Sequence, residues 1–179
     1  MLIRAASRAE FAEVGDIRAA AYIAGGFLKP DSGYLQTLRA LGADGDGQVL
    51  VAVCRGSDGS RPGADRIAGT IMLQSWPQAG QVVTGADEAE IRALAVAPDA
   101  QGGGVGTALL RAVIERAAGQ GVRHLVLSTQ PDMTAAHRRY AQAGFVRLAD
   151  RDWSPAPGVD LLVYGLRLTP AERSGRGAR

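Results

Sequence analysis

A run of glycines at the start of an expected helix is the stretch with the clearest chemical meaning. It reads Gln101-Gly102-Gly103-Gly104-Val105-Gly106-Thr107 and follows a strand that ends at Pro98. Glycines let a backbone approach a ligand closely, and free N–H groups at a helix start attract anions. A diphosphate would suit such a loop. The other interpretation is a helix-start turn with surplus glycines, in a chain that has 24 of them.

Two familiar phosphate loops do not fit this run. The dinucleotide fingerprint would need a third glycine at position 107, where the chain has Thr107. A P-loop needs Gly-Lys-Ser/Thr, and Lys29, the single lysine, has no glycine before it. The loop is therefore predicted to hold some other phosphate-bearing ligand.

Tyr140-Ala141-Gln142-Ala143-Gly144-Phe145 is the second stretch that could do chemistry. A phenol has a pKa of about 10 and can act as a proton donor. Taken alone, Tyr140 is more simply a half-buried aromatic near the end of a helix that Gly144 closes.

Hydrophobic periodicity and turn residues predict the elements that must position these residues. Strands are expected at 2–6, 48–55, 66–76, 88–97, 124–129, 145–148 and 159–168, and helices at 8–24, 34–41, 105–118 and 133–143. Residues 56–65 and 149–158 are expected to be loops. The order β-α-α-β-β-β-α-β-α-β-β predicts one α/β domain over residues 1–168, with antiparallel pairing except for a crossover around the glycine loop. Residues 169–179 are expected to be a disordered basic tail.

The strand before the loop reads Leu94-Ala95-Val96-Ala97-Pro98. This strand, the Gln101–Gly106 run and the later Tyr-x-x-x-Gly-Phe motif together resemble the GNAT N-acetyltransferase superfamily, in which Gln/Arg-x-x-Gly-x-Gly/Ala binds acyl-CoA. The resemblance covers roughly residues 1–168. It implies a single-domain acyl-CoA acyltransferase fold, with a mixed, mostly antiparallel central sheet flanked by helices.

The resemblance also implies roles for residues. Acetyl-CoA would be the co-substrate, and the N–H groups of Leu94, Ala95 and Val96 would bond the acetyl oxygen and pantetheine. The diphosphate would lie on residues 102–107 (Gly102, Gly103, Gly104, Val105, Gly106 and Thr107), faced by Gln101. Tyr140 would act as general acid. Glu90 is the candidate base, directly or through a water. Strand alternation places it on the same face as Leu94, four residues later, although it could be only a surface carboxylate.

Two positions depart from the family pattern. Met133 stands where an asparagine often contacts the cofactor, and Arg139 stands where an apolar residue often precedes the tyrosine. Arg139 ends the basic cluster His137-Arg138-Arg139. We interpret this cluster as a solvated helix face, or else as a partner for the 3′-phosphate of CoA. His124 is expected to be structural, and Cys54 a core thiol.

The acceptor is expected to be a small-molecule amine or a peptide. Specificity would come from the first helices and the last strands. Those regions offer aromatic residues and carboxylates that could hold a cationic amine: Tyr22, Phe27, Asp31, Tyr34, Asp150, Asp152, Trp153 and Asp160. Small amines, amino acids, antibiotics and protein N-termini stay open. The alternative function is a non-catalytic acyl-CoA-binding or regulatory module, and a homodimer through the final strands is a further inference from the resemblance.

Composition excludes several other classes of protein. One cysteine and two histidines leave no zinc finger and no HExxH helix, so no metal is expected. The net charge of +2 comes from the last ten residues, so the first 169 are neutral. A neutral body argues against nucleic acid as the main partner. No signal core or membrane span is visible, so a cytoplasmic protein is expected.

Overall fold

The computed structural model describes residues 1–55, 65–80 and 82–169. Its strands are β1 Leu2–Ala5, β2 Gln48–Arg55, β3 Asp65–Ser75, β4 Glu88–Val96, β5 His124–Thr129, β6 Val146–Arg147, β7 Trp153–Ala156 and β8 Val159–Arg167. Its helices are α1 Phe11–Ala24, α2 Tyr34–Ala40, α3 Val105–Gly119 and α4 Thr134–Gln142, with short 3-10 turns at Arg8–Glu10, Pro98–Ala100 and Ala149–Arg151. Of the expected tail at 169–179 and the expected loop at 56–65, residues 170–179 and 56–64 lie outside the described residues.

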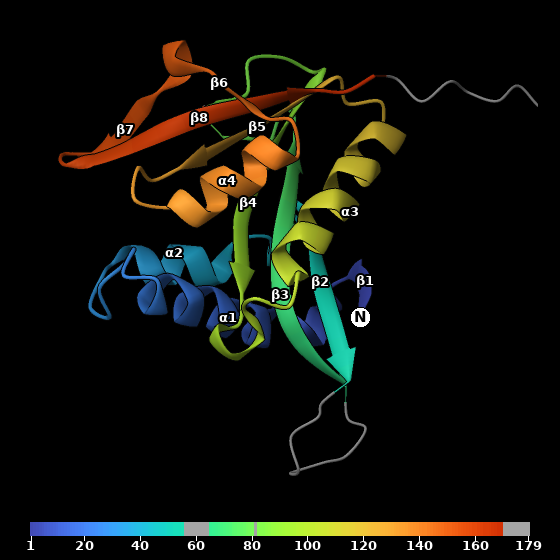
Figure 1. Cartoon of the computed structure of the whole chain (residues 1–179), viewed down its shortest axis with the longest axis vertical. Coiled ribbons are helices and arrows are strands. Elements are labelled where there is room, and N and C mark those ends of the chain that lie inside the picture. Colours follow the sequence, from blue (N-terminus) through green and yellow to red (C-terminus); the bar gives the residue numbers. More distant parts are fainter. Residues whose placement is uncertain (56–64, 81, 170–179) are drawn as a thin grey trace, which may run out of the picture.

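The strands form one mixed sheet in the order β1-β2-β3-β4-β5-β8-β6, and β7 pairs with β8 (Figure 1). Only β4 and β5 are parallel, and every other described pair is antiparallel. A parallel pair needs a crossover connection, and the glycine loop with α3 provides it. The predicted α/β class, its mostly antiparallel sheet and its single crossover are confirmed.

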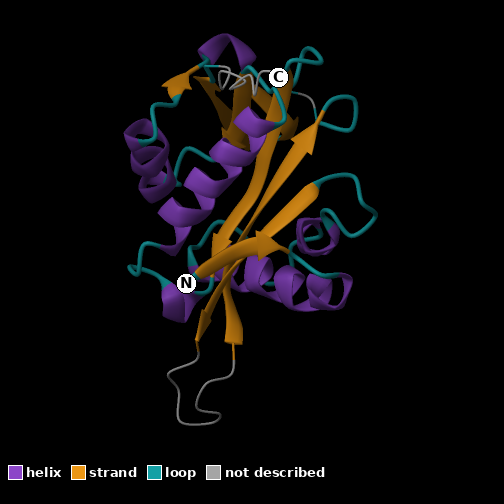
Figure 2. Ribbon diagram, turned by 90° about the vertical axis from the view of Figure 1, so that its right-hand side faces the viewer, coloured by secondary structure: helices purple, strands orange, loops and turns teal. Residues whose placement is uncertain are grey.

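Helices cover both faces of this sheet (Figure 2). Helix α3 buries a stripe at helical spacing, which includes Leu109, Val113 and Ala117, against one face. On the other face, Val14 of α1 and Leu38 of α2 pack on β2 and β3. Each face has its own apolar cluster, so a change of face along β4 moves a side chain from one cluster to the other. Within the described residues no helix is both long and apolar enough to cross a membrane.

One expected loop is wrong. Residues 149–158 contain strand β7, which pairs with β8 through Trp153↔Leu161 and Ala156↔Val159. Pro155 had suggested a loop because proline cannot donate to a ladder. A strand that pairs on one side only tolerates proline, since its N–H positions on the open side need no partner.

Candidate active site

A β-bulge in β4 shapes the site. The register of β3 with β4 runs through the pairs Thr70↔Ala95 and Met72↔Arg92. Ile71 of β3 is therefore opposite two residues of β4, Ala93 and Leu94. Ala93 has φ 51°, in the left-handed region that non-glycine residues seldom adopt. The extra residue bends the strand and reverses the alternation of its side chains.

Beyond the bulge, β4 separates from β5. Their parallel pairing runs from Glu88↔His124 to Ile91↔Leu127 and stops there (Figure 1). Strand β4 continues to Val96 and β5 to Thr129, but beyond Ile91↔Leu127 the two strands do not pair with each other. The splayed backbone that the family resemblance implies at Leu94–Val96 is therefore present. Its polar groups on the β5 side are free for a ligand.

The glycine loop follows this strand and begins helix α3. Gly102 and Gly104 have φ 81° and 77°, and Gly104 is the N-cap of α3. The first N–H groups of a helix have no intrahelical partner, so they are free to bond an anion. Gly69 on β3 lets this helix start approach the sheet, because a methyl group there would come 3.0 Å from Val105 Cγ1 and 3.1 Å from Leu109 Cδ1 of α3.

The separated strand and the loop line one cavity of about 530 Å³. Nine of the ten expected cofactor residues line it, all except Gly103: Leu94, Ala95, Val96, Gln101, Gly102, Gly104, Val105, Gly106 and Thr107. Tyr140 also lines it, and Glu90 does not. The structure thus brings the loop, the strand and the tyrosine together, and places the expected base outside this group.

Tyr140 stands in the last turn of α4 and is 6% exposed. Its ring packs near those of Phe145 and Tyr164, with centroids 5.9 Å and 6.3 Å away. Gly144, with φ 90°, lets the chain turn so that the Phe145 N–H donates to the Tyr140 carbonyl (3.0 Å). Burial raises the pKa of the Tyr140 phenol, so the hydroxyl keeps its proton at neutral pH.

Glu90 lies on the opposite face of β4 from Leu94, so the expectation that the two share a face is wrong. Leu94 packs in the cluster under α3, and Ala93 packs in the cluster under α1, because the bulge reverses the alternation. The Glu90 carboxylate accepts a hydrogen bond from the Gly80 N–H (3.0 Å) and lies 3.9 Å from Arg92 Nε. Burial raises its pKa above the usual value, and Arg92 opposes this shift.

A second buried carboxylate, Glu88, ties four segments together. It accepts hydrogen bonds from His124 Nδ1 (2.8 Å), Arg151 Nη1 (2.9 Å) and the Thr84 N–H (2.8 Å). Burial pushes its pKa upward, but the hydrogen bonds from Thr84, His124 and Arg151 outweigh burial and hold the pKa at about 2. His124 therefore has the structural position that was expected.

The end of the cavity beside α1 is aromatic. Tyr22 and Phe27 line it, with ring centroids 6.3 Å apart in an edge-to-face arrangement. The acidic residues proposed to hold a cationic amine do not line it. Asp152 pairs with Arg147 (2.5 Å), and Asp160 accepts from the Ser154 hydroxyl (2.6 Å). Aromatic residues and carboxylates thus do not combine in this cavity.

Sequence reasoning missed several residues of the cavity wall: Ser128, Thr129, Ala135 and Ala136. No motif marks the two from β5. Trp153, expected near the acceptor, donates from Nε1 to the Ser128 hydroxyl (3.1 Å) and so supports the wall without lining it.

The basic cluster on α4 is not uniformly solvated. Arg138 is exposed. His137 Nε2 lies 3.0 Å from the Gln130 carbonyl oxygen, and Arg139 lines the cavity together with Met133. The interpretation of the cluster as a solvated helix face is therefore wrong for Arg139, which is partly buried.

Comparison with known proteins agrees with this geometry. Residues 14–145 match the model of the acetyltransferase (GNAT) family. A GNAT-family acetyltransferase of Staphylococcus aureus Mu50 superposes with a TM-score of 0.70 at 19% identity, covering 94% of this chain and 99% of that one. No curated protein sequence matches the chain.

Two further similar structures bear on ligands. The yncA protein of Salmonella typhimurium, solved with its cofactor acetyl-CoA, has a TM-score of 0.66 at 21% identity and covers 94% of each chain. The ribosomal-protein-S18-alanine N-acetyltransferase of Escherichia coli has a TM-score of 0.65 at 20% identity and covers 97% of each chain. The family match spans most of the sequence and includes the separated strand and the glycine loop, so this chain belongs to the GNAT acetyltransferase family.

Proposed function

We propose that this acetyltransferase moves the acetyl group of acetyl-CoA to a primary amine by direct attack of the amine. One observation carries the proposal: the end of β4 that has separated from β5, the start of α3 and Tyr140 line the same cavity. These are the parts that acyl transfer from a thioester requires. They are a backbone to polarise the carbonyl, an anchor for the donor and a proton donor for the departing sulfur.

The residues present fit acetyl-CoA. The N–H groups from Gly102 to Thr107 would hold its diphosphate, and Gln101 would face the same phosphates. The cavity wall also includes apolar residues, among them Ile91, Leu94 and Ala136, which suit a pantetheine arm. Acetyl-CoA would supply the acetyl group as an activated thioester.

The strand beyond the bulge would polarise the thioester carbonyl. Leu94, Ala95 and Val96 lie past the last pair with β5, so sheet pairing on that side does not occupy their backbone groups. Backbone donors aimed at a developing oxyanion typically contribute about 3 kcal/mol each. Because the donors are fixed in a strand, they need no reorganisation during the reaction.

Tyr140 would protonate the sulfur as the carbon–sulfur bond breaks. Its raised pKa keeps it protonated before the reaction, which a general acid requires. The same buried surroundings disfavour the free thiolate, so the pKa of the departing thiol would rise together with that of the phenol.

Glu90 would accept the amine proton through a water. It faces away from the α3 side of the sheet, on the side where Tyr22 and Phe27 close the cavity. Burial raises the pKa of Glu90, which brings it closer to the pKa that a general base needs near neutral pH. Because Glu90 does not line the cavity, direct contact with the amine is not part of the proposal.

Calorimetric titration with acetyl-CoA and with CoA tests the cofactor site. We expect one-to-one binding in the micromolar range, and loss of binding in Gly104→Glu. That variant adds a negative charge and a side chain at a residue with φ 77°. No binding of either ligand by the wild-type protein would refute the proposal.

An amine screen then separates the enzyme from the alternative, a non-catalytic acyl-CoA-binding module. Structures similar to this one include ribosomal-protein-alanine N-acetyltransferases, so peptides with N-terminal alanine belong in the screen with small amines and amino acids. Turnover of any amine, measured by release of free thiol, supports the enzyme. Tight binding with no turnover across the screen would favour the module.

A further inference from the structure

The charge of the cavity wall is unusual for a site that should hold a diphosphate. The loop from Gln101 to Thr107 has no charged side chain. Among the described residues that line the cavity, the charged ones are Arg92 and Arg139. Arg92 lies on β4 and donates to Gln74 on β3 (3.1 Å). Arg139 is therefore the cation available at the loop end of the cavity.

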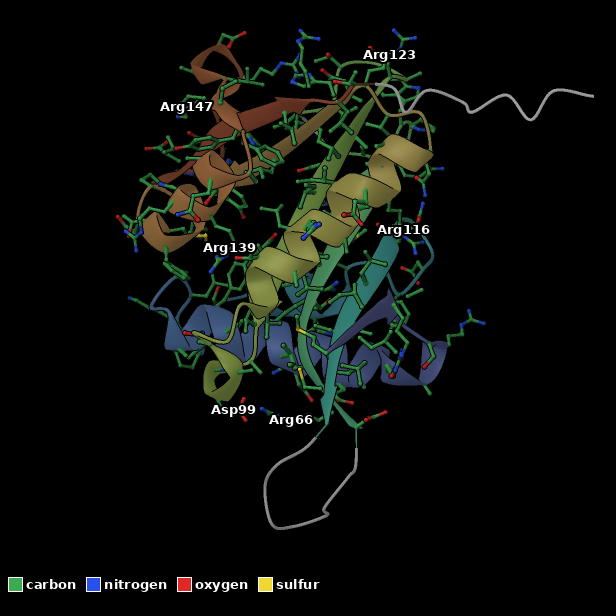
Figure 3. The ribbon with its side chains drawn as sticks, turned by 45° about the vertical axis from the view of Figure 1, so that its right-hand side comes forward. Arg66, Asp99, Arg116, Arg123, Arg139 and Arg147 are labelled. Atoms are coloured by element: carbon green, nitrogen blue, oxygen red, sulfur yellow. The ribbon has the colours of Figure 1, made fainter. Side chains whose placement is uncertain are left out.

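The Arg139 guanidinium lies against the start of α3. A methyl group at Gly106 would come within 3.2 Å of both its Cζ and its Nε, and within 3.4 Å of Val96 Cγ2. Figure 3 shows the side chain extending from α4 toward this helix start. Within the described part of the chain, no hydrogen bond or ion pair occupies the Arg139 side chain, although it is partly buried.

The helical geometry of α4 gives Arg139 and Tyr140 separate directions. Consecutive residues of a helix point about 100° apart. Tyr140 packs beside Phe145 and Tyr164, whereas Arg139 reaches Gly106. One turn of α4 can thus contact both the sulfur end and the phosphate end of a long ligand.

We propose that Arg139 donates charge-assisted hydrogen bonds to the diphosphate of the acyl-CoA donor, and so supplies the positive charge that the glycine loop lacks. A guanidinium can bond two phosphate oxygens at once, and N–H groups of the loop can bond the others. The inference rests on the proposed function, because it assigns a further residue to the same cofactor site. It makes this enzyme selective for thioesters that carry the CoA diphosphate over thioesters that lack phosphate.

Three ligands and three variants test the proposal. CoA carries the diphosphate and the 3′-phosphate, dephospho-CoA keeps only the diphosphate, and pantetheine has no phosphate. Affinities of the two nucleotides are measured by calorimetry, and that of pantetheine by ligand-observed NMR. The variants are Arg139→Leu, Arg139→Lys and, as a matched control on the exposed side of the same turn, Arg138→Leu.

We expect Arg139→Leu to weaken CoA and dephospho-CoA equally, by about 10- to 100-fold, as typical for loss of hydrogen bonds between charged groups. Pantetheine affinity should stay within about twofold. Arg139→Lys should recover part of the loss, because lysine keeps the charge without the two-pronged geometry. Arg138→Leu should bind all three ligands as the wild type does.

Other results would overturn the assignment. A loss for CoA that spares dephospho-CoA would place Arg139 on the 3′-phosphate. An equal loss for pantetheine would mean that Arg139 only shapes the cavity, and unchanged CoA affinity would mean that it contributes nothing. Failure of the wild-type protein to bind CoA would instead refute the proposed function itself. Thermal unfolding of each variant shows whether a loss reflects misfolding.

Discussion

At the residue scale, the substitution Tyr140→Phe removes the phenol hydroxyl and nothing else. The aromatic ring would keep its packing beside Phe145 and Tyr164, so the fold and the cavity wall should not change. We expect kcat to fall by about 100-fold or more, since general acid catalysis typically contributes that much. The dissociation constant of acetyl-CoA should stay within about twofold. Steady-state kinetics with calorimetry check both values, and an unchanged kcat would remove Tyr140 from the chemistry.

The role proposed for Glu90 predicts how kcat/KM depends on pH. Burial raises its pKa, so the carboxyl stays protonated to a higher pH than an exposed glutamate does. If the carboxylate is the base, kcat/KM should rise with pH through that pKa, and Glu90→Gln should abolish this limb of the profile. Asp87→Asn, at an exposed neighbour, should leave the limb in place. A Glu90→Gln profile that keeps its acidic limb would reduce Glu90 to an anchor for the Gly80 N–H.

At the element scale, the bulge in β4 depends on one strained residue. Ala93 holds φ 51°, which a β-branched side chain adopts only at a higher cost and glycine adopts freely. We expect Ala93→Val to lower the free energy of unfolding by about 1–3 kcal/mol and to weaken acetyl-CoA binding. Ala93→Gly should bind as the wild type does. Urea unfolding and calorimetry test this pair, and equal stability of the two variants would show that the bulge tolerates any side chain.

The same bulge marks the limit of what the sequence could predict. Within the part of the chain that the structure describes, periodicity located every α-helix and all strands but one, because apolar spacing and glycine stops are local signals. The bulge leaves no such signal, since Ala93 is neither glycine nor asparagine, and so the faces of Glu90 and Leu94 were predicted wrongly. Strand β7 was missed because Pro155 is a breaker in most strands but not at an open edge.

The residues expected to bind the cofactor were easier to locate at the cavity than the rest of its wall. The Gln101–Thr107 loop is continuous in sequence, so a motif marks it, and all of its residues except Gly103 line the cavity. The aromatic end of the cavity combines Tyr22 and Phe27 with residues of β4 and β5, which only the folded chain brings together. A carboxylate such as Asp152 was plausible there by composition, but its ion pair with Arg147 holds it elsewhere.

At the scale of the whole molecule, Glu88 joins segments that are far apart in sequence. Its partners His124 and Arg151 are 36 and 63 residues away, and Thr84 belongs to the preceding loop. These contacts fix β4 to β5 at Glu88↔His124, the first pair of their parallel segment, and they hold the turn before β7 against the sheet. The shape of the cavity therefore depends on a carboxylate that does not line it.

The pKa of Glu88 sets how this junction responds to acid. The pKa is about 2 in the folded protein, against an ordinary value of 4.5. A carboxyl with a lowered folded pKa stabilises the fold fully above its unfolded pKa, and this stabilisation is lost as pH falls from about 4.5 toward 2. We expect Glu88→Gln to lower the free energy of unfolding by about 1–3 kcal/mol at pH 7, and by much less at pH 3. Urea unfolding at pH 7 and at pH 3 measures the difference.

Glu10→Gln is the control for a local ion pair. The Glu10 side chain lies near the start of the chain, pairs with Arg4 and also has a pKa of about 2. Its effect should be smaller, because solvent screens that pair. A Glu88→Gln cost that is the same at pH 7 and pH 3 would mean that the side chain acts by packing alone and that its charge does not hold the four segments together.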